Sequence, residues 1–255
     1  MKNVWSFEKN EDGTVCITGY KGEDYDIVIP DQIGANKVTQ IAAYAFSPEK
    51  PRRAKQRRWF LEQIRSITIP DGVRSIGAYA FAGCKGLSHL VLPTGICNIE
   101  SGTFKKCEGL SKIDIPEGVI SIGASAFEGC FAVCINLPDS VTCLGNSAFA
   151  DCLVLENIRI PHGITKIPDF AFSACASLVR ILIPDGVTSV GDYAFDGCLK
   201  LEKITIPESV TYIGMSAFAD AESAFSHKDT PTLFLHEGSF AQQYAKENDL
   251  PFVVI

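Results

Sequence analysis

The sequence predicts a mostly β solenoid, in which about eight small units of the same shape stack along one axis. Two observations lead to this prediction. An aliphatic residue followed by proline recurs every 22 or 23 residues between Ile69 and Pro207. Each of these dipeptides stands at the same place in the pattern L-x-x-I-x-I-P-x-x-V-x-x-I-G-x-x-A-F-x-x-C. A fixed period of this length indicates one supersecondary unit per period, which buries its apolar face against its neighbours.

Each unit reads as one coil of the chain. Its I-x-I segment alternates apolar and polar residues, which is typical of a strand with one buried face. The following proline offers no backbone N–H and ends the strand, and a turn such as Pro70-Asp71-Gly72 redirects the chain. The V-x-x-I segment predicts a second short extended piece. We expect the strands of successive coils to pair in parallel, about 4.8 Å apart.

The end of each unit predicts a bend and one helical turn. The glycine after the second aliphatic residue is expected at a positive φ, which glycine adopts without steric cost. The A-F-x-x-C segment places its Phe and Cys three residues apart, on one face of a helical turn. A column of aromatic residues could form a ligand platform, but the small residue before each Phe favours a packed internal spine. The spine consists of Phe46, Phe81, Phe104, Phe127, Phe149, Phe172, Phe195 and Phe218.

Six of the ten cysteines follow these phenylalanines by three residues: Cys84, Cys107, Cys130, Cys152, Cys175 and Cys198. Three interpretations compete. Zinc sites use close pairs such as C-x₂-C, which are absent from the sequence. A ladder of disulfides is conceivable, but side chains in one column point the same way and do not converge. We therefore expect a column of buried, reduced thiols that pack as small apolar side chains, which suits a reducing compartment.

The chain divides into four segments. Residues 1–46 form an N-terminal cap and first repeat, 47–63 a basic insertion, 64–220 the regular repeats and 221–255 a C-terminal cap. Within the last segment we expect a strand at 233–235. One step of 22 residues, across Cys130–Cys134, puts Ala132 in the usual Leu position and predicts a thin place in the core.

The insertion concentrates positive charge on an acidic chain. The chain has 23 basic and 30 acidic residues. Six of the basic ones fall within nine positions: Lys50, Arg52, Arg53, Lys55, Arg57 and Arg58. The segment can bind an anionic partner, clamp onto the acidic body of the protein, or be a solvated loop with a short helix at 54–64. In the last interpretation, which we favour, Phe60, Leu61 and Ile64 dock on the end of the solenoid and the basic run has no stacking role.

The repeat resembles the BspA-like (Treponema pallidum type) leucine-rich repeat family, over roughly residues 11–255. The opening GTVCITGYKGEDYDIVIP resembles that family's first, capping repeat. The closing LFLHEGSFAQQYAKENDLPFVVI resembles its terminal cap, which implies a strand, a short helix at 239–247 and a last strand. The resemblance implies a leucine-rich repeat solenoid: a right-handed superhelix with a concave parallel sheet and caps at both ends. It also implies a role in adhesion or protein interaction, often at a bacterial surface, with no catalytic residues or cofactor.

Composition excludes several other classes of function. A net charge of −7 disfavours nucleic acid as a partner, because such proteins present a basic face. No apolar run is long enough to span a membrane, and the start MKNVWSFEKNEDG lacks the apolar core of a signal peptide. As written the chain is expected in the cytoplasm; the resemblance implies the cell surface or secretion where a leader has been removed. The four histidines occupy unrelated repeat positions, so neither a metal site nor an enzyme is indicated.

The outward residues of the strands are the candidate recognition face. Those inside the I-x-I segments are Thr68, Val91, Asp114, Asn136, Arg159, Leu182 and Thr205. They mix apolar, polar and charged types, whereas a glycan face favours repeated aromatics and a nucleic-acid face repeated Lys or Arg. We expect a repeat scaffold that binds another protein. Two alternatives stay open: an anion-binding module that acts through Lys50–Arg58, and a purely structural repeat segment.

Overall fold

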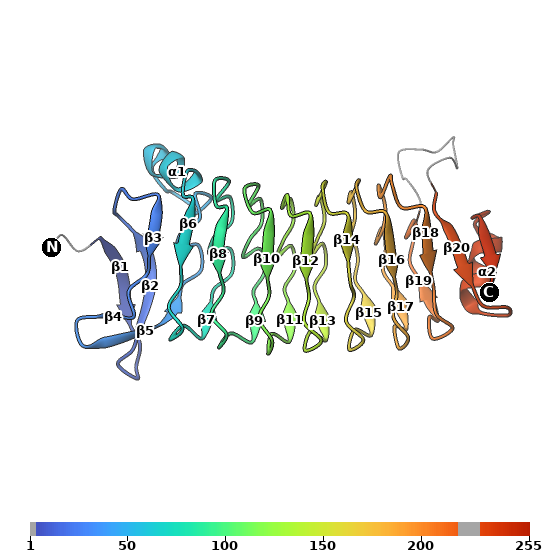
Figure 1. The fold of residues 1–255 in the computed structure, drawn as a ribbon, viewed down its shortest axis with the longest axis horizontal. Helices are drawn as coiled ribbons and strands as arrows, with labels where there is room; N and C mark the ends of the chain where they lie inside the picture. Colours follow the sequence, from blue (N-terminus) through green and yellow to red (C-terminus); the bar gives the residue numbers. More distant parts are fainter. Residues whose placement is uncertain (1–3, 219–229) are drawn as a thin grey trace.

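The protein is an elongated solenoid in a computed structural model that describes residues 4–218 and 230–255 (Figure 1). Its main sheet consists of the I-x-I strands, and the ladder runs in parallel from β3 to β8 and from β10 to β21. These strands are β3 (Asp26–Val28), β6 (Ser66–Thr68), β8 (His89–Val91), β10 (Lys112–Asp114), β12 (Cys134–Asn136), β14 (Asn157–Ile158), β16 (Arg180–Leu182), β18 (Lys203–Thr205), β20 (Thr232–Leu235) and β21 (Phe252–Val254).

The solenoid has about ten turns rather than the eight expected from the sequence. Eight coils carry a spine phenylalanine, and these are the ones that the repeat pattern identifies. The two further rungs, β20 and β21, belong to the C-terminal cap and lack that pattern. They nevertheless pair in parallel with the sheet, at Thr205↔Phe234 and Phe234↔Val253, and so extend the same architecture.

A second column of two-residue strands follows the turns after the prolines, as the V-x-x-I segments predict. It continues from β5 (Asn36–Ile41) through β7 (Ser75–Ile76), β9 (Asn98–Ile99), β11 (Ser121–Ile122), β13 (Cys143–Leu144), β15 (Lys166–Ile167), β17 (Ser189–Val190) and β19 (Tyr212–Ile213). The pairing is parallel within three groups, β5 with β7, β9 to β13 and β15 to β19, for example at Ile122↔Leu144 and Val190↔Ile213.

The A-F-x-x-C segments form tight turns that are hydrogen-bonded to the next coil, and the expected helical turn is wrong. Each turn is closed by one bond, such as Cys130 N–H to the Phe127 carbonyl at 3.0 Å. The Phe amide donates to the following coil instead, as from Phe127 to Ala148 O at 2.8 Å. Two positions before the Phe lies a residue at positive φ, which is Ser125 in this coil (φ 54°). Its own amide also donates to the following coil, to the Asn146 carbonyl. These segments therefore make a third inter-coil ladder.

The recurring glycine of the repeat is required by close packing between coils, and its expected positive φ is wrong. Gly145 and its equivalents are not among the residues at positive φ, which lie two positions later in the coil. A Cβ on Gly145 would lie 2.4 Å from the backbone nitrogen of Ala124 in the preceding coil. Real Cβ atoms essentially never come so close, so the backbones of successive coils approach at this point only because no side chain intervenes.

The phenylalanine column is a packed internal spine, as predicted. Each spine ring is at most 2% exposed. Neighbouring rings stack with centroids 5.4–5.7 Å apart from Phe46 to Phe218. The stack is continuous across the 22-residue step, where Phe127 and Phe149 are 5.6 Å apart. The missing residue is therefore absorbed in the connection around the buried Ala132, and the spine keeps its spacing.

The six column cysteines are buried free thiols, as predicted, and they also act as donors. Each thiol donates to the Phe carbonyl of the preceding coil, for example from Cys130 Sγ to Phe104 O at 2.9 Å and from Cys175 Sγ to Phe149 O at 3.1 Å. Burial raises the pKa of the Cys198 thiol to about 12 and that of the Cys107 thiol well above its usual value. These thiols are therefore protonated at neutral pH and are poor nucleophiles.

Different elements close the two ends. At the N-terminus, β1 (Trp5–Lys9) and β2 (Val15–Tyr20) form an antiparallel hairpin, and β2 pairs in parallel with β5. A second hairpin, with Gly34 in its turn, joins β4 (Gln32–Ile33) to β5.

At the C-terminus, α2 (Phe240–Glu247) begins at Ser239, whose side chain accepts a hydrogen bond from Gln242 N. Its Tyr244 covers the end of the spine, edge-on to Phe218 at 6.5 Å. The expected helix and final strands of this cap are thus confirmed, while its expected first residues, 221–229, lie outside the described part of the chain.

Replacing Phe149 by Ala should lower the free energy of unfolding by about 3–5 kcal/mol, because it opens a cavity between two stacked rings. Urea denaturation followed by circular dichroism measures this change. Phe131→Ala is the matched control: this ring is 40% exposed and outside the spine, so its loss should cost far less. Equal losses of stability in the two variants would show that the column is not the core.

Thiol titration of the native protein at neutral pH should detect Cys97, Cys134 and Cys143, which are exposed. The six column thiols should react only after denaturation, when all ten cysteines of the chain become accessible. Rapid modification of more than half of the cysteines in the folded protein would contradict the buried column.

Candidate interaction surfaces

The outward side chains of the main sheet lie where the strand alternation predicts. Val91 is 76% exposed and Leu182 63% exposed, and Thr68, Asp114, Asn136 and Arg159 are also exposed; Thr205 is half-buried. The face is not uniform along the solenoid. Its polar groups are largely engaged with one another at the N-terminal end and in the middle, and less so toward the C-terminal end.

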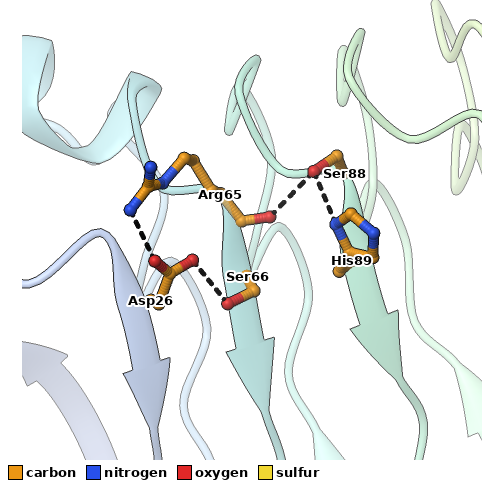
Figure 2. Close-up of polar contacts among 5 residues, drawn as sticks. All are labelled: Asp26, Arg65, Ser66, Ser88 and His89. Atoms are coloured by element: carbon orange, nitrogen blue, oxygen red, sulfur yellow. Dashed lines mark hydrogen bonds and ion pairs between the residues drawn. The ribbon is translucent and has the colours of Figure 1, made fainter.

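At the N-terminal end, polar side chains connect three neighbouring strands (Figure 2). Asp26 on β3 binds Arg65 Nη2 at 2.5 Å and accepts a hydrogen bond from Ser66 Oγ on β6 at 2.8 Å. Ser88 Oγ lies 3.2 Å from the Arg65 carbonyl and 2.8 Å from His89 Nδ1. These groups satisfy one another, so this part of the face offers a partner few unpaired polar atoms.

In the middle of the face, polar side chains also form hydrogen bonds with one another. Asp114 accepts hydrogen bonds from Lys112 on its own strand, at 2.9 Å, and from Asn136 on the next strand, at 3.2 Å. Both hydrogen bonds favour the ionised carboxylate, that from Lys112 more strongly, and they hold the pKa of Asp114 below its usual value. Asp114 and Asn136, two of the predicted recognition residues, are therefore brought together by the sheet and bind each other.

A groove of about 560 Å³ opens on the face between β14, β16 and β18. The basic residues that line it are Arg159, His162, Arg180 and Lys203, and no Asp or Glu is among its lining residues. Leu182 and Thr205 also line it, so the structure brings together three of the predicted recognition residues.

Arg180 and Lys203 belong to the outward column just before the I-x-I segments, which the sequence also places on the recognition face. Sequence reasoning missed His162, which follows a strand proline and reads as a turn residue. Arg159 is paired with Asp139 at 2.6 Å, whereas Arg180 and Lys203 have no described ion pair.

The insertion forms helix α1 (Lys55–Glu62), which packs on the N-terminal end of the solenoid beside β6 (Figure 1). Leu61 and Ile64 are fully buried and Phe60 is 9% exposed, as predicted for a docked loop. Phe60 stacks on Tyr25 with a centroid distance of 5.2 Å. Trp59, next to Phe60, is 58% exposed and contributes little to this packing.

Two arginines of the basic run make structural contacts, although the sequence predicts no stacking role for the run. Arg57 donates to the carbonyls of Tyr20 and Gly22, and its guanidinium lies 4.3 Å from the centroid of Phe60. Arg53 donates to the Tyr44 carbonyl at 3.1 Å. Burial lowers the pKa of both side chains. The basic residues that stay exposed in this segment are Arg52, Lys55 and Arg58; Lys50 is half-buried.

Comparison with known proteins identifies the repeat. The sequence profile of the BspA type leucine-rich repeat region, in six copies, matches residues 59–133 and 98–225, more than half of the chain. The chain belongs to the BspA-type leucine-rich repeat family. No curated protein sequence matches it significantly.

Two solved structures of bacterial leucine-rich repeat proteins resemble the whole fold. One, from Bacteroides ovatus, is 26% identical with a TM-score of 0.79; the match covers 99% of this chain and 66% of that protein. The chain thus spans just under two thirds of that relative's length. The other, the T. pallidum leucine-rich repeat protein, is 26% identical with a TM-score of 0.62, over 87% of this chain and 88% of that protein.

No helix within residues 4–218 and 230–255 is long and apolar enough to cross a membrane. Nor does this described part of the chain contain a group of three or more His, Cys, Asp or Glu side chains placed to hold a metal ion.

Phe60→Ala should lower the free energy of unfolding by about 3 kcal/mol, because the ring is buried against Tyr25 and beneath Arg57. The neighbouring Trp59→Ala should change it by no more than about 0.5 kcal/mol, since that ring is exposed. Thermal or urea denaturation of the two variants measures the difference. A larger loss for Trp59→Ala than for Phe60→Ala would contradict the observed packing of α1.

Proposed function

We propose that the protein is a non-enzymatic scaffold that binds another protein through the main sheet face, with the groove between β14, β16 and β18 at the centre of the interface. Membership of a leucine-rich repeat family supports a scaffold in general. The observation that carries the specific proposal is the composition of the groove, which is basic and partly apolar on a chain of net charge −7.

The chemistry of the groove favours a segment that combines carboxylates with apolar side chains. Arg180 and Lys203 stand side by side on paired strands, and their charges attract acidic groups and steer their approach. The exposed Leu182, next to Arg180 on β16, supplies an apolar contact whose burial contributes affinity. A largely rigid stack of coils holds these side chains in place, so little ordering is required on binding.

Adhesion is one form that such a function takes when the protein is displayed outside the cell. The same surface would then bind a protein of another cell or of a host. The binding chemistry is identical in either compartment, so the proposal concerns the groove and its acidic, partly apolar partner.

Reversing the two unpaired groove charges in the variant Arg180→Glu/Lys203→Glu should weaken binding of the native partner more than about tenfold, because like charges are then juxtaposed. The partner is first isolated by affinity capture from the source cells, and the Kd is then measured with both proteins purified. Lys166→Glu/Lys200→Glu is the matched control, since it makes the same change of net charge outside the groove.

The control should bind as tightly as the unmodified protein at physiological salt. Equal weakening in both variants would show that net charge alone governs binding, and an unchanged Kd in the groove variant would place the interface elsewhere. Leu182→Asp provides a second readout that does not depend on removing positive charge. It should weaken binding of the same partner while leaving the melting temperature unchanged, because Leu182 is exposed.

A further inference from the structure

A second cleft lies at the opposite end of the solenoid, between the N-terminal hairpin and the insertion, and has a volume of about 520 Å³. Its lining includes five basic residues and no acidic residue: Lys21, Lys50, Arg52, Arg53 and Arg57. Lys21 follows β2, and the other four belong to residues 50–57 of the insertion. Ser6 and Thr18 add hydroxyl groups from β1 and β2. The chain thus brings charges from two distant segments to one concave place.

None of these five residues forms an ion pair within residues 4–218 and 230–255. Basic residues elsewhere in the same structure do pair, as Lys85 does with Glu108 at 2.7 Å and Lys105 with Glu128 at 2.9 Å. Asp24 accepts a hydrogen bond from Tyr20 Oη, and Glu23 lines the neighbouring pocket, which Lys21 and Arg57 also line. Glu23 partly offsets the charge of Arg57, but the cleft itself is lined by five cations and no carboxylate.

Two of the five side chains are already fixed in place. Arg57 is held by two backbone carbonyls and by the ring of Phe60, and Arg53 by the Tyr44 carbonyl. The Nε of Arg53 is buried and has no hydrogen-bond partner in the described part of the chain. An N–H donor without an acceptor costs stability, and a ligand that supplied an acceptor to this atom would remove that cost.

The cations of the insertion also repel one another. Burial lowers the pKa of Arg53 most, and the neighbouring charges of Arg57 and Arg58 lower it further. Like charges held close together in this way favour an anion that lies between them.

The turn that presents Arg52 has an unusual backbone. Arg52 adopts a φ of 61°, in the left-handed region, although it belongs to none of the repeated turns where most such residues occur. A residue with a side chain is disfavoured there, and such positions cluster at ligand-binding and other functional sites. The conformation places Arg52 in the lining of the cleft.

From these observations we propose that the cleft binds a compact oxyanion of the phosphate or sulfate class. Three or more N–H donors around one tetrahedral group are typical of sites for such anions, and arginine matches their geometry with paired donors. A volume of 520 Å³ leaves room for the group that carries the anion, such as a sugar. This site is separate from the sheet groove and does not depend on the function proposed for it.

The test is a titration of the ¹⁵N-labelled full chain, monitored by NMR, with inorganic phosphate and with inorganic sulfate. Chemical-shift changes should concentrate at Gly19–Lys21 and Lys50–Arg53. The variant Lys50→Ser/Arg52→Asn removes two cations of the cleft, and Asn tolerates the left-handed conformation at position 52. It should weaken binding by about tenfold or more, because each lost charged hydrogen bond contributes on this order.

The control Lys37→Ser/Lys55→Ser makes the same change of charge at the same end of the solenoid, at exposed positions outside the cleft. It should bind within about twofold of the unmodified protein, since long-range attraction between exposed charges is weak at moderate salt. The groove variant Arg180→Glu/Lys203→Glu should also retain binding. Absence of any titratable shift in the unmodified protein, or equal weakening in the cleft variant and the control, would overturn the proposal.

A third titration, with a monosulfated disaccharide and its unsulfated counterpart, distinguishes the sources of the anion. Tighter binding of the sulfated sugar than of inorganic sulfate identifies a carbohydrate sulfate as the ligand. Tighter binding of inorganic phosphate than of either identifies free phosphate. In each case the affinity should depend on Lys50 and Arg52. If the unsulfated sugar bound while the sulfated sugar, sulfate and phosphate did not, the proposal would be contradicted.

Discussion

Hydrogen bonding between the backbones of successive coils is the constraint on which the rest of this structure depends. Three ladders run along the solenoid: the main sheet, the column of short strands, and the turns around each phenylalanine. Together they hold neighbouring coils at a nearly constant spacing, so a residue type that fits at one place in a coil fits at the same place in the next. The phenylalanines follow this spacing, with centroids slightly farther apart than the ~4.8 Å between strands because the rings are offset.

Much of the fold could be predicted from the sequence because the period itself carries the information. The strands, the phenylalanine spine and the buried thiols follow from alternation and repetition. The helix near Phe60 was expected from the apolar residues of the insertion, and the helix near Tyr244 from the family resemblance. The errors arose where a residue is explained by the neighbouring coil instead of its own. Gly145 is small because Ala124 lies against it, and Cys130 is not only apolar filler, since its thiol donates to Phe104. A single coil, read alone, shows neither contact.

The candidate sites were less predictable for the same physical reason. Outward side chains contribute little to stacking, so the period places no requirement on them and their types vary from coil to coil. The sheet groove combines Arg159, Arg180 and Lys203 from three coils and two columns, and it is visible only once the strands are paired. The insertion shows the opposite case: its charge was evident from the sequence, but only the structure separates the structural Arg53 and Arg57 from the exposed Lys55 and Arg58.

The two basic surfaces lie at different ends of a molecule in which each coil contacts only its neighbours. Stability in such a stack is close to a sum of coil and nearest-neighbour terms, and no core residue is shared by both ends. A substitution at Arg180 should therefore leave binding at the N-terminal cleft unchanged. Energetic coupling between the two sites would require a structural change in every intervening coil. The sites are also too far apart for their charges to interact strongly at physiological salt, where screening is nearly complete beyond about 10 Å. The architecture thus allows the groove and the cleft to bind chemically different partners at the same time, with one stack of phenylalanines supporting both.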